Sequence, residues 1–159
     1  LGWVRPAHPS IDTAIHAAAG PRLRDDCAAI MTLQGHPEPT GFAKITRAYN
    51  LPCRYVLHTV GPIHRGDDTI IQESHDLANA YLSCLNLAEK ISTIKTLAFC
   101  CISTGVFGFP ASRACQIAIK TVEQWLVNKP NHIQTIIFNV FSVHDEMLYQ
   151  RMLGNTNDG

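Results

Sequence analysis

The chain has 159 residues, of which 46% are hydrophobic and 16% are charged. This length suits one domain, and the hydrophobic content excludes a disordered chain. Lys and Arg together number 13, as do Asp and Glu, so the formal charge is zero. A neutral chain lacks the bulk positive charge that holds a nucleic-acid backbone or an anionic membrane surface. No apolar run approaches the roughly 20 residues that span a bilayer.

The six cysteines give no sign of a disulfide framework. None belongs to a C-x-x-C pair, and the adjacent Cys100 and Cys101 would point to opposite faces of a strand. In a chain of this length, such cysteines are expected to be small buried side chains of a protein in a reducing compartment. We therefore expect free thiols and a cytoplasmic location, with a disulfide-linked fold as the less favoured alternative.

The first half of the chain predicts two helices followed by two strands. Apolar residues recur at helical spacing in two segments, which Gly20-Pro21 separates. Ser10 and Asp12 are alternative N-caps for the first helix. Two later segments have the composition of strands, and the second is richer in β-branched and aromatic residues. The expected elements are helices over 11–20 and from residue 21, a loop over 34–41, and strands over 43–48 and 54–60.

The second half alternates helices and strands. The expected elements are a helix near 70–91, a strand over 96–102, a helix that includes 114–125, a strand over 134–141 and a helix over 143–153. Thr96–Ile102 is almost continuously apolar, which predicts a strand buried on both faces. Strands that alternate with helices predict an α/β fold with a largely parallel central sheet.

The segment after this apolar strand has the composition of an anion-binding loop. Its hydroxyl residues and glycines, which precede a helix, are Ser103, Thr104, Gly105 and Gly108. In α/β sheets, phosphates bind beyond the carboxyl ends of strands, near backbone N–H groups and a helix N-terminus. The spacing matches neither G-x-G-x-x-G nor the P-loop. The residues alone therefore leave two interpretations open, a phosphate site and an ordinary strand–helix turn.

Polar residues near the start of the chain have both structural and functional interpretations. Asp12 is either a first-turn carboxylate that the helix dipole favours, or a carboxylate that acts on a water or a ribose hydroxyl. His8 is one imidazole in its loop, and a metal site needs three or four converging ligands, which favours a solvated histidine. His16 and His58 are expected to be core histidines.

Several blocks of the sequence, taken in order, carry a family resemblance. They are Ile11–Gly20, Thr40–Thr46, Tyr49–Pro52, Tyr55–Pro62 and Ile102–Pro110. Together they resemble the macrodomain, the ADP-ribose-binding α/β module. The first block resembles the helix start of its catalytic loop, and the last resembles the loop that wraps the diphosphate and the distal ribose. The chain is most similar to MacroD-type hydrolases. The residues that resemble their microbial zinc-containing branch are Leu1-Gly2, Pro6, His8, Ile11-Asp12, Glu38–Gly41 and the Cys100-Cys101 pair.

The resemblance implies a three-layer α/β/α fold with a mixed, largely parallel central sheet. Macrodomains carry further strands before this point, including an Asn-rich strand end that contacts the distal ribose and an acidic residue that reads adenine. This sequence lacks them, so we expect an amino-terminally truncated macrodomain. Residues 1–153 would form the carboxy-terminal two-thirds of the fold, and 154–159 a polar tail.

The resemblance also implies an activity and a set of site residues. The parent protein would remove ADP-ribose from mono-ADP-ribosylated proteins, its partners, and would be a monomer at full length. Asp12 would orient or activate the water, or hold the distal ribose. The loop would bind diphosphate and ribose through backbone amides and ring contact, and Phe141 would lie against adenine. The implied ligand-binding residues are Ile102, Ser103, Thr104, Gly105, Val106, Phe107 and Phe141.

The implied cofactor and the implied activity each have an alternative. The zinc-containing branch carries a Cys, a His and a second Cys in the loop before the catalytic Asp, and here those positions are Trp3, His8 and Ser10. Because only His8 could ligate zinc, we expect no bound cofactor. The altered loop and the missing strands favour a non-catalytic ADP-ribose reader or an inactive fragment, whereas Asp12 favours a hydrolase.

Overall fold

The computed structural model describes residues 10–128 and 132–154, and its elements follow the predicted order. The helices are α1 (Ile11–Ala19), α2 (Pro21–Gln34), α3 (Ile70–Glu89), α4 (Ala111–Asn128) and α5 (Val143–Gly154), with a 3-10 turn η1 (Asp67–Thr69) before α3. The strands are β1 (Ala43–Arg47), β2 (Tyr55–Thr59), β3 (Thr96–Cys100) and β4 (Thr135–Asn139). Apart from η1, each of these elements was predicted.

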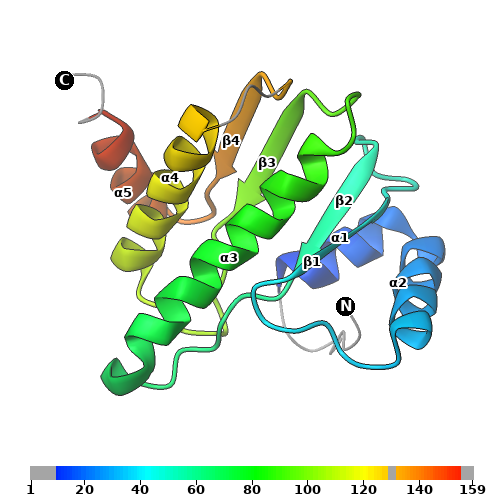
Figure 1. Ribbon diagram of the computed structural model, residues 1–159, viewed down its shortest axis with the longest axis horizontal. Helices are drawn as coiled ribbons and strands as arrows, with labels where there is room; N and C mark the ends of the chain where they lie inside the picture. Colours follow the sequence, from blue (N-terminus) through cyan, green and yellow to red (C-terminus); the bar gives the residue numbers. More distant parts are fainter. Residues whose placement is uncertain (1–9, 129–131, 155–159) are drawn as a thin grey trace.

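The four strands form two sheets of two strands each. β1 and β2 are antiparallel, with Lys44 opposite His58, whereas β3 and β4 are parallel, with Phe99 opposite Phe138. In Figure 1, α3 lies across both strand pairs and α4 runs beside it. Within the described ranges, β2 pairs only with β1 and β3 only with β4.

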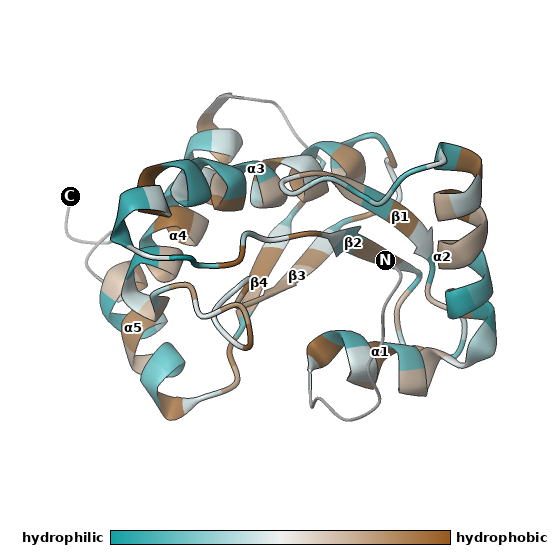
Figure 2. Cartoon of the chain, turned by 90° about the horizontal axis from the view of Figure 1, so that it is seen from below, coloured by the Kyte–Doolittle hydropathy of each residue, from teal (hydrophilic) through white to brown (hydrophobic). Residues whose placement is uncertain are grey.

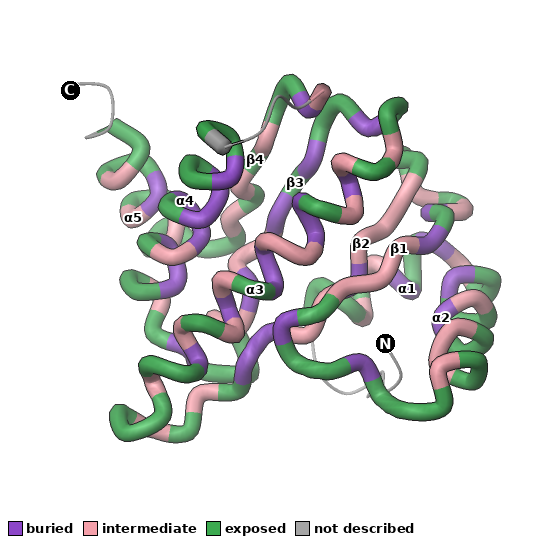
Figure 3. Tube along the Cα trace, in the orientation of Figure 1, coloured by how far each residue is buried: buried purple, intermediate pink, exposed green. Residues whose placement is uncertain are grey.

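Helices cover the strands on two sides, which confirms the predicted α/β/α layering. Seen from below in Figure 2, α3 and α4 lie on one side of the strands and α1 on the other. In the larger core, Leu77, Tyr81 and Leu85 of α3 are fully buried against β3 and α4. The Tyr81 and Phe99 rings lie 5.0 Å apart, and Figure 3 shows the buried positions along α3, β3 and α4.

The expectation that β3 is buried on both faces is wrong. Leu97 and Phe99 are buried, whereas Thr96 and Ala98, which alternate with them, are exposed. Successive side chains of a strand point to opposite faces, so only the face of β3 toward α3 is covered by the described residues. An apolar run shows that both faces of a strand carry apolar side chains, but it does not show whether another element packs on each face.

A second, smaller core joins α1 and α2 to the sheet of β1 and β2. Its buried residues are Ala19, Leu23 and Cys27, and Val56 of β2 packs against them. Gly20 separates the two helices with a φ of 85°, a left-handed value that favours glycine, and its N–H donates to the His16 carbonyl. The chain therefore turns sharply between α1 and α2.

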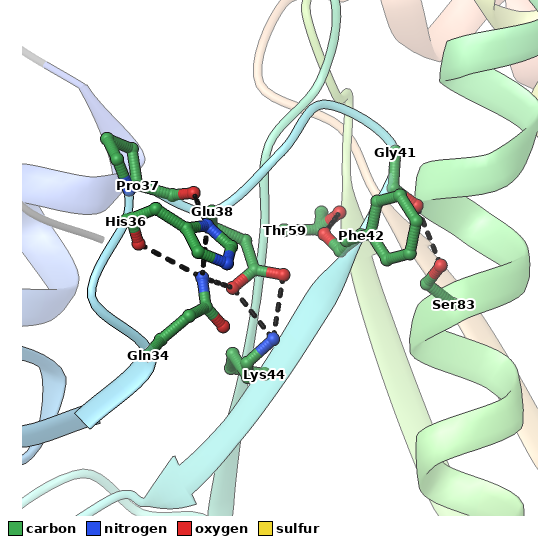
Figure 4. Close-up of polar contacts among 9 residues, drawn as sticks. All are labelled: Gln34, His36, Pro37, Glu38, Gly41, Phe42, Lys44, Thr59 and Ser83. Atoms are coloured by element: carbon green, nitrogen blue, oxygen red, sulfur yellow. Dashed lines mark hydrogen bonds and ion pairs between the residues drawn. The ribbon is translucent and has the colours of Figure 1, made fainter. Parts of the chain in front are cut away.

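Polar contacts connect the segment after α2 to β1 and to α3 (Figure 4). Glu38 is buried and forms an ion pair of 2.8 Å with Lys44 of β1. The Gln34 side chain donates to the Glu38 carboxylate at 3.3 Å, and the Ser83 hydroxyl donates to the Gly41 carbonyl at 2.7 Å. A buried carboxylate needs such partners, so these contacts fix the path of the loop.

The structure can be compared with two expectations from composition, which concern the cysteines and membrane-spanning segments. All six cysteines are free, as expected, but Cys53 is exposed rather than buried. Among the residues that the structure describes, no helix has both the length and the apolar composition needed to cross a membrane.

Candidate functional site

The loop over residues 101–110, between β3 and α4, folds back on itself. Ser103 and Gly108 both have a φ of 66°, in the left-handed region. The Gly108 N–H donates to the Gly105 carbonyl at 3.0 Å, and the Phe109 N–H donates to the Ser103 carbonyl at 2.9 Å. A non-glycine residue at positive φ is uncommon and is maintained by the surrounding structure, so Ser103 marks a conformation that the rest of the loop enforces.

The two ends of this loop are buried and its middle is open. Ile102 and Phe109 are buried, whereas Val106 is 73% exposed. A side chain at Gly105 would meet no atom within 4 Å, and Gly105 has no left-handed φ. The Ser103 Oγ is buried without a hydrogen-bond partner in the described part of the chain. The middle of the loop therefore has room for a ligand beside its backbone. Of the two loop glycines, only Gly108 has a left-handed φ that favours glycine.

The carboxyl ends of β2 and β3 meet at Gly61, a residue that sequence reasoning did not assign to the site. A Cβ at Gly61 would collide with the side chains of Ser103 and Ile102. The segment after β2 continues along the same loop, because the His64 N–H donates to the Phe107 carbonyl at 2.9 Å. The close approach of the loop thus requires glycine at position 61. In the sequence, Gly61-Pro62 marked only the end of a strand.

Ser10 rather than Asp12 is the N-cap of α1. The Ser10 Oγ accepts the Thr13 N–H at 3.2 Å. The Asp12 side chain is 51% exposed, and its Oδ1 lies 3.6 Å from Nε2 of His16. Within residues 10–128 and 132–154, no hydrogen bond or ion pair joins Asp12 to the loop over 101–110. Asp12 therefore has no part in the N-cap, and its carboxylate is exposed to solvent at the start of α1.

The remaining predicted site residues lie in different surroundings. Phe141 follows β4 and is fully exposed. Because β4 runs parallel to β3, Phe141 lies at the same edge of that sheet as the loop over 101–110. His8 and Trp3 lie outside the described residues.

His16 and His58 are buried, as expected, and with Cys27 they form a cluster that the sequence did not predict. One ligand atom from each of the three lies within 4.8 Å of the others. The His58 Nε2 is 2.9 Å from the Thr46 hydroxyl and 3.9 Å from the Cys27 sulfur. Burial lowers the pKa of His58 to about 4 and raises the pKa of the Cys27 thiol.

The donors of this cluster fit a hydrogen-bonded core better than a metal site. A zinc ion is held by thiolates and by imidazole nitrogens with free lone pairs at about 2.0–2.3 Å. Here burial raises the pKa of the Cys27 thiol, and the His58 Nε2 lies within hydrogen-bond distance of the Thr46 hydroxyl. We therefore interpret His58, Cys27 and Thr46 as hydrogen-bonded groups of the smaller core, whereas the buried Nδ1 of His16 has no hydrogen-bond partner in the described part of the chain.

The thiols of the larger core are poorly suited to nucleophilic chemistry. Burial raises the pKa of Cys84 to about 12 and of Cys101 and Cys115 to about 11. A thiol with such a pKa is protonated at neutral pH, whereas the thiolate is the nucleophile. Among the described residues that the sequence predicted for the site, Asp12 and the loop over 101–110 thus remain the candidates.

Comparison with known proteins gives a consistent result. The Macro domain family matches residues 6–118 of the chain. A protein named protein-ADP-ribose hydrolase from Treponema medium is 56% identical over 152 residues, and one of the same name from Staphylococcus aureus (strain MSSA476) is 47% identical over 150. These matches cover 96% and 94% of this chain but 57% and 56% of the relatives. The chain therefore spans little more than half the length of these curated relatives.

Solved structures give the same family. A mutant macrodomain of Oceanobacillus iheyensis with ADPR has a TM-score of 0.85 at 35% identity, over 100% of this chain and 81% of that one. A Trypanosoma brucei macrodomain in complex with ADP-ribose has a TM-score of 0.80 at 33% identity, over 92% of this chain and 58% of that one.

Proposed function

Because the chain belongs to the macro domain family, we propose that it binds ADP-ribose and hydrolyses it from mono-ADP-ribosylated protein side chains. The observation that carries the proposal is the open backbone of the loop over 101–110, beyond the carboxyl end of β3. Relatives named protein-ADP-ribose hydrolase at 56% and 47% identity support the hydrolytic part. The proposal includes the MacroD type of this activity.

In the proposed complex, the loop holds the diphosphate through backbone N–H groups. The residues assigned to this contact are Ile102, Ser103, Thr104, Gly105, Val106 and Phe107. Oriented N–H groups bind anions without a basic side chain, which agrees with the net charge of zero. The Ser103 Oγ is itself buried against Gly61, so Ser103 would contact the ligand through its backbone N–H. Phe141, fully exposed at the end of β4, is assigned to adenine.

Asp12 is assigned the chemical step. Water attacks the anomeric carbon of the distal ribose, the bond from that carbon to the protein side chain breaks, and the proton of the water goes to the leaving group. A carboxylate at the start of α1 can orient this water, accept its proton and pass that proton to the leaving group. The half-exposed Asp12 side chain is available for that role because Ser10 caps the helix.

The remaining parts of the proposal concern partners, cofactor and location. We propose that no zinc is held before α1, because the Ser10 hydroxyl accepts the Thr13 N–H and a serine replaces a thiolate ligand of the related branch. Free cysteines support a reducing compartment, and we propose the cytoplasm. The partners would be ADP-ribose and modified proteins rather than nucleic acid or membranes, and the full-length protein would be a monomer.

A non-catalytic ADP-ribose reader is the second candidate function. The observation that favours it is the lack of any hydrogen bond or ion pair between Asp12 and the loop in the described ranges. Binding by the loop would then not require Asp12.

Two substitutions separate these functions. Asp12→Asn should retain ADP-ribose binding in calorimetry and reduce release of ADP-ribose from a modified protein by about 100-fold or more, because the water loses its base. Gly105→Glu should abolish both, because its side chain fills the open space and its charge repels the diphosphate. Gly154→Glu, at an equally open glycine of α5, is the matched control.

The outcomes are distinct. Wild-type affinity in Gly105→Glu would contradict the assignment of the loop, and wild-type turnover in Asp12→Asn would contradict the role of Asp12. A wild-type chain that binds ADP-ribose but releases none from modified protein would be a reader.

A further inference from the structure

A buried carboxylate at the start of α3 has no part in the chemistry proposed above. The Glu73 side chain is 7% exposed. Its Oε1 accepts the Thr69 hydroxyl at 2.6 Å and the Arg65 N–H at 2.9 Å, and its Oε2 accepts Nδ1–H of His64 at 2.7 Å. The Thr69 hydrogen bond, followed by those from His64 and Arg65, holds the pKa of Glu73 below its usual range despite burial.

Burying such a carboxylate is unfavourable unless it has this full set of donors. All three donors come from the segment between β2 and α3. Glu73 therefore fixes the path of that segment against the first turn of α3, and it fixes the orientation of the His64 ring.

His64 contacts the loop over 101–110 on its other side. Its backbone N–H donates to the Phe107 carbonyl at 2.9 Å. Its ring lies edge-on to the Phe109 ring, with centroids 6.2 Å apart, and Phe109 is 2% exposed. Phe109 in turn closes the loop through its N–H to the Ser103 carbonyl at 2.9 Å. A shift of His64 would therefore be transmitted to both ends of the turn that Ser103 begins.

We propose that Glu73 and His64 are positioning residues that hold the loop over 101–110 in the conformation that receives the diphosphate. The inference rests on the proposed function for the identity of the ligand. The contacts that carry it, from Glu73 through His64 to Phe107 and Phe109, are independent of that ligand.

The experiment compares four variants of this pair with the wild-type chain. Glu73→Ala and His64→Ala remove the contact, whereas His64→Asn keeps an N–H donor near the place of Nδ1. Glu73→Gln keeps an acceptor for Thr69 and Arg65, and it replaces Glu73→Ala if that variant fails to fold. The control is the Glu89–His132 pair, at 3.7 Å near the opposite end of α3, removed by Glu89→Ala and His132→Ala.

The first measurement needs no ligand. The NMR amide signals of residues 103–109 should move in Glu73→Ala and His64→Ala, stay close to wild type in His64→Asn, and stay unchanged in the two control variants. The second measurement compares ADP-ribose with adenosine, which lacks the diphosphate and the distal ribose. Affinity for ADP-ribose should fall by about 10- to 100-fold in the two alanine variants of the pair, with little change for adenosine.

Each outcome decides the question. Unmoved loop signals in both alanine variants would overturn the proposal, as would an equal loss of affinity for the two ligands. An equal movement of the loop signals in the control variants would show general destabilisation and would also overturn it. If the wild-type chain binds no ADP-ribose, the proposed function fails, and the loop signals alone decide whether Glu73 and His64 position the loop.

Discussion

At the scale of single residues, His58 shows how burial creates a dependence on pH. Its imidazole is 8% exposed and is surrounded by Thr46, Cys27 and His16. Burial above all, with the proximity of His16 as a smaller contribution, lowers its pKa from an ordinary 6.5 to about 4. The neutral ring accordingly satisfies Thr46 and Cys27 without the cost of a buried charge.

We predict that this histidine makes the fold less stable in mild acid. The unfolded chain takes up a proton on His58 as the pH falls below about 6.5, whereas the folded chain takes it up only near pH 4. The free energy of unfolding should therefore be highest above pH 6.5 and fall by roughly 3 kcal/mol toward pH 4, at about 1.36 kcal/mol per pKa unit. Urea unfolding at a series of pH values measures this.

His58→Gln, which keeps a polar group near Thr46, should flatten that part of the profile. His75→Gln, at an exposed histidine of α3, should leave it unchanged and is the matched control. A His58→Gln profile that parallels wild type between pH 6.5 and 4 would refute the assignment.

At the scale of elements, the sequence predicted the positions of the helices and strands better than it predicted which of their faces are buried. The ends of β2 and β3 lie close to the predicted ends, because β-branched and apolar runs report local structure. The exposed Ala98 was missed because exposure depends on which element covers each face of β3.

The candidate site was predicted only where its residues are contiguous in the sequence. The sequence indicated the loop over 101–110 as a candidate because hydroxyl residues and glycines lie close together there, after a strand. Gly61, His64 and Glu73 were missed because they are distant from this loop in the sequence and reach it only through folding. Gly61-Pro62 marked only the end of a strand, and the sequence pattern around His64 and Glu73 did not indicate their contacts with this loop.

We predict that the close approach at Gly61 makes any larger residue at this position destabilising. Gly61→Ala would force a methyl group against the side chains of Ser103 and Ile102, so the loop or β2 must shift. Overpacking of this kind costs about 1–3 kcal/mol of unfolding free energy. Urea unfolding without ligand measures the loss, and Gly105→Ala, at a glycine with nothing within 4 Å, is the control. Equal stability of Gly61→Ala and wild type would contradict the prediction.

At the scale of the whole molecule, the described residues divide into two cores of unequal size. The larger joins α3, α4, β3, β4 and α5, whereas the smaller has three buried residues, Ala19, Leu23 and Cys27. Burial of apolar surface is the dominant favourable contribution to folding, so the smaller core has less to hold it. Asp12 lies beside the smaller core, at the start of α1, and the loop over 101–110 adjoins the larger one.

We predict that the two cores open at different free energies. Backbone amides of α1 and α2 should exchange with deuterium faster than those in the buried middle of α3, because local opening follows the density of buried apolar contacts. Hydrogen exchange followed by mass spectrometry measures both regions in one sample. Equal protection of α1 and α3 would show that the cores open together.

Because the two cores differ in size, heating should affect hydrolysis and ADP-ribose binding differently. As the temperature rises, the part of the chain that carries Asp12 would open first, while the part next to the diphosphate loop remains folded. Between those two temperatures the protein would still capture ADP-ribose but would no longer release it from a modified side chain. The protein would then be an enzyme while α1 and α2 are packed against β1 and β2, and a binding protein without activity once these two helices have opened.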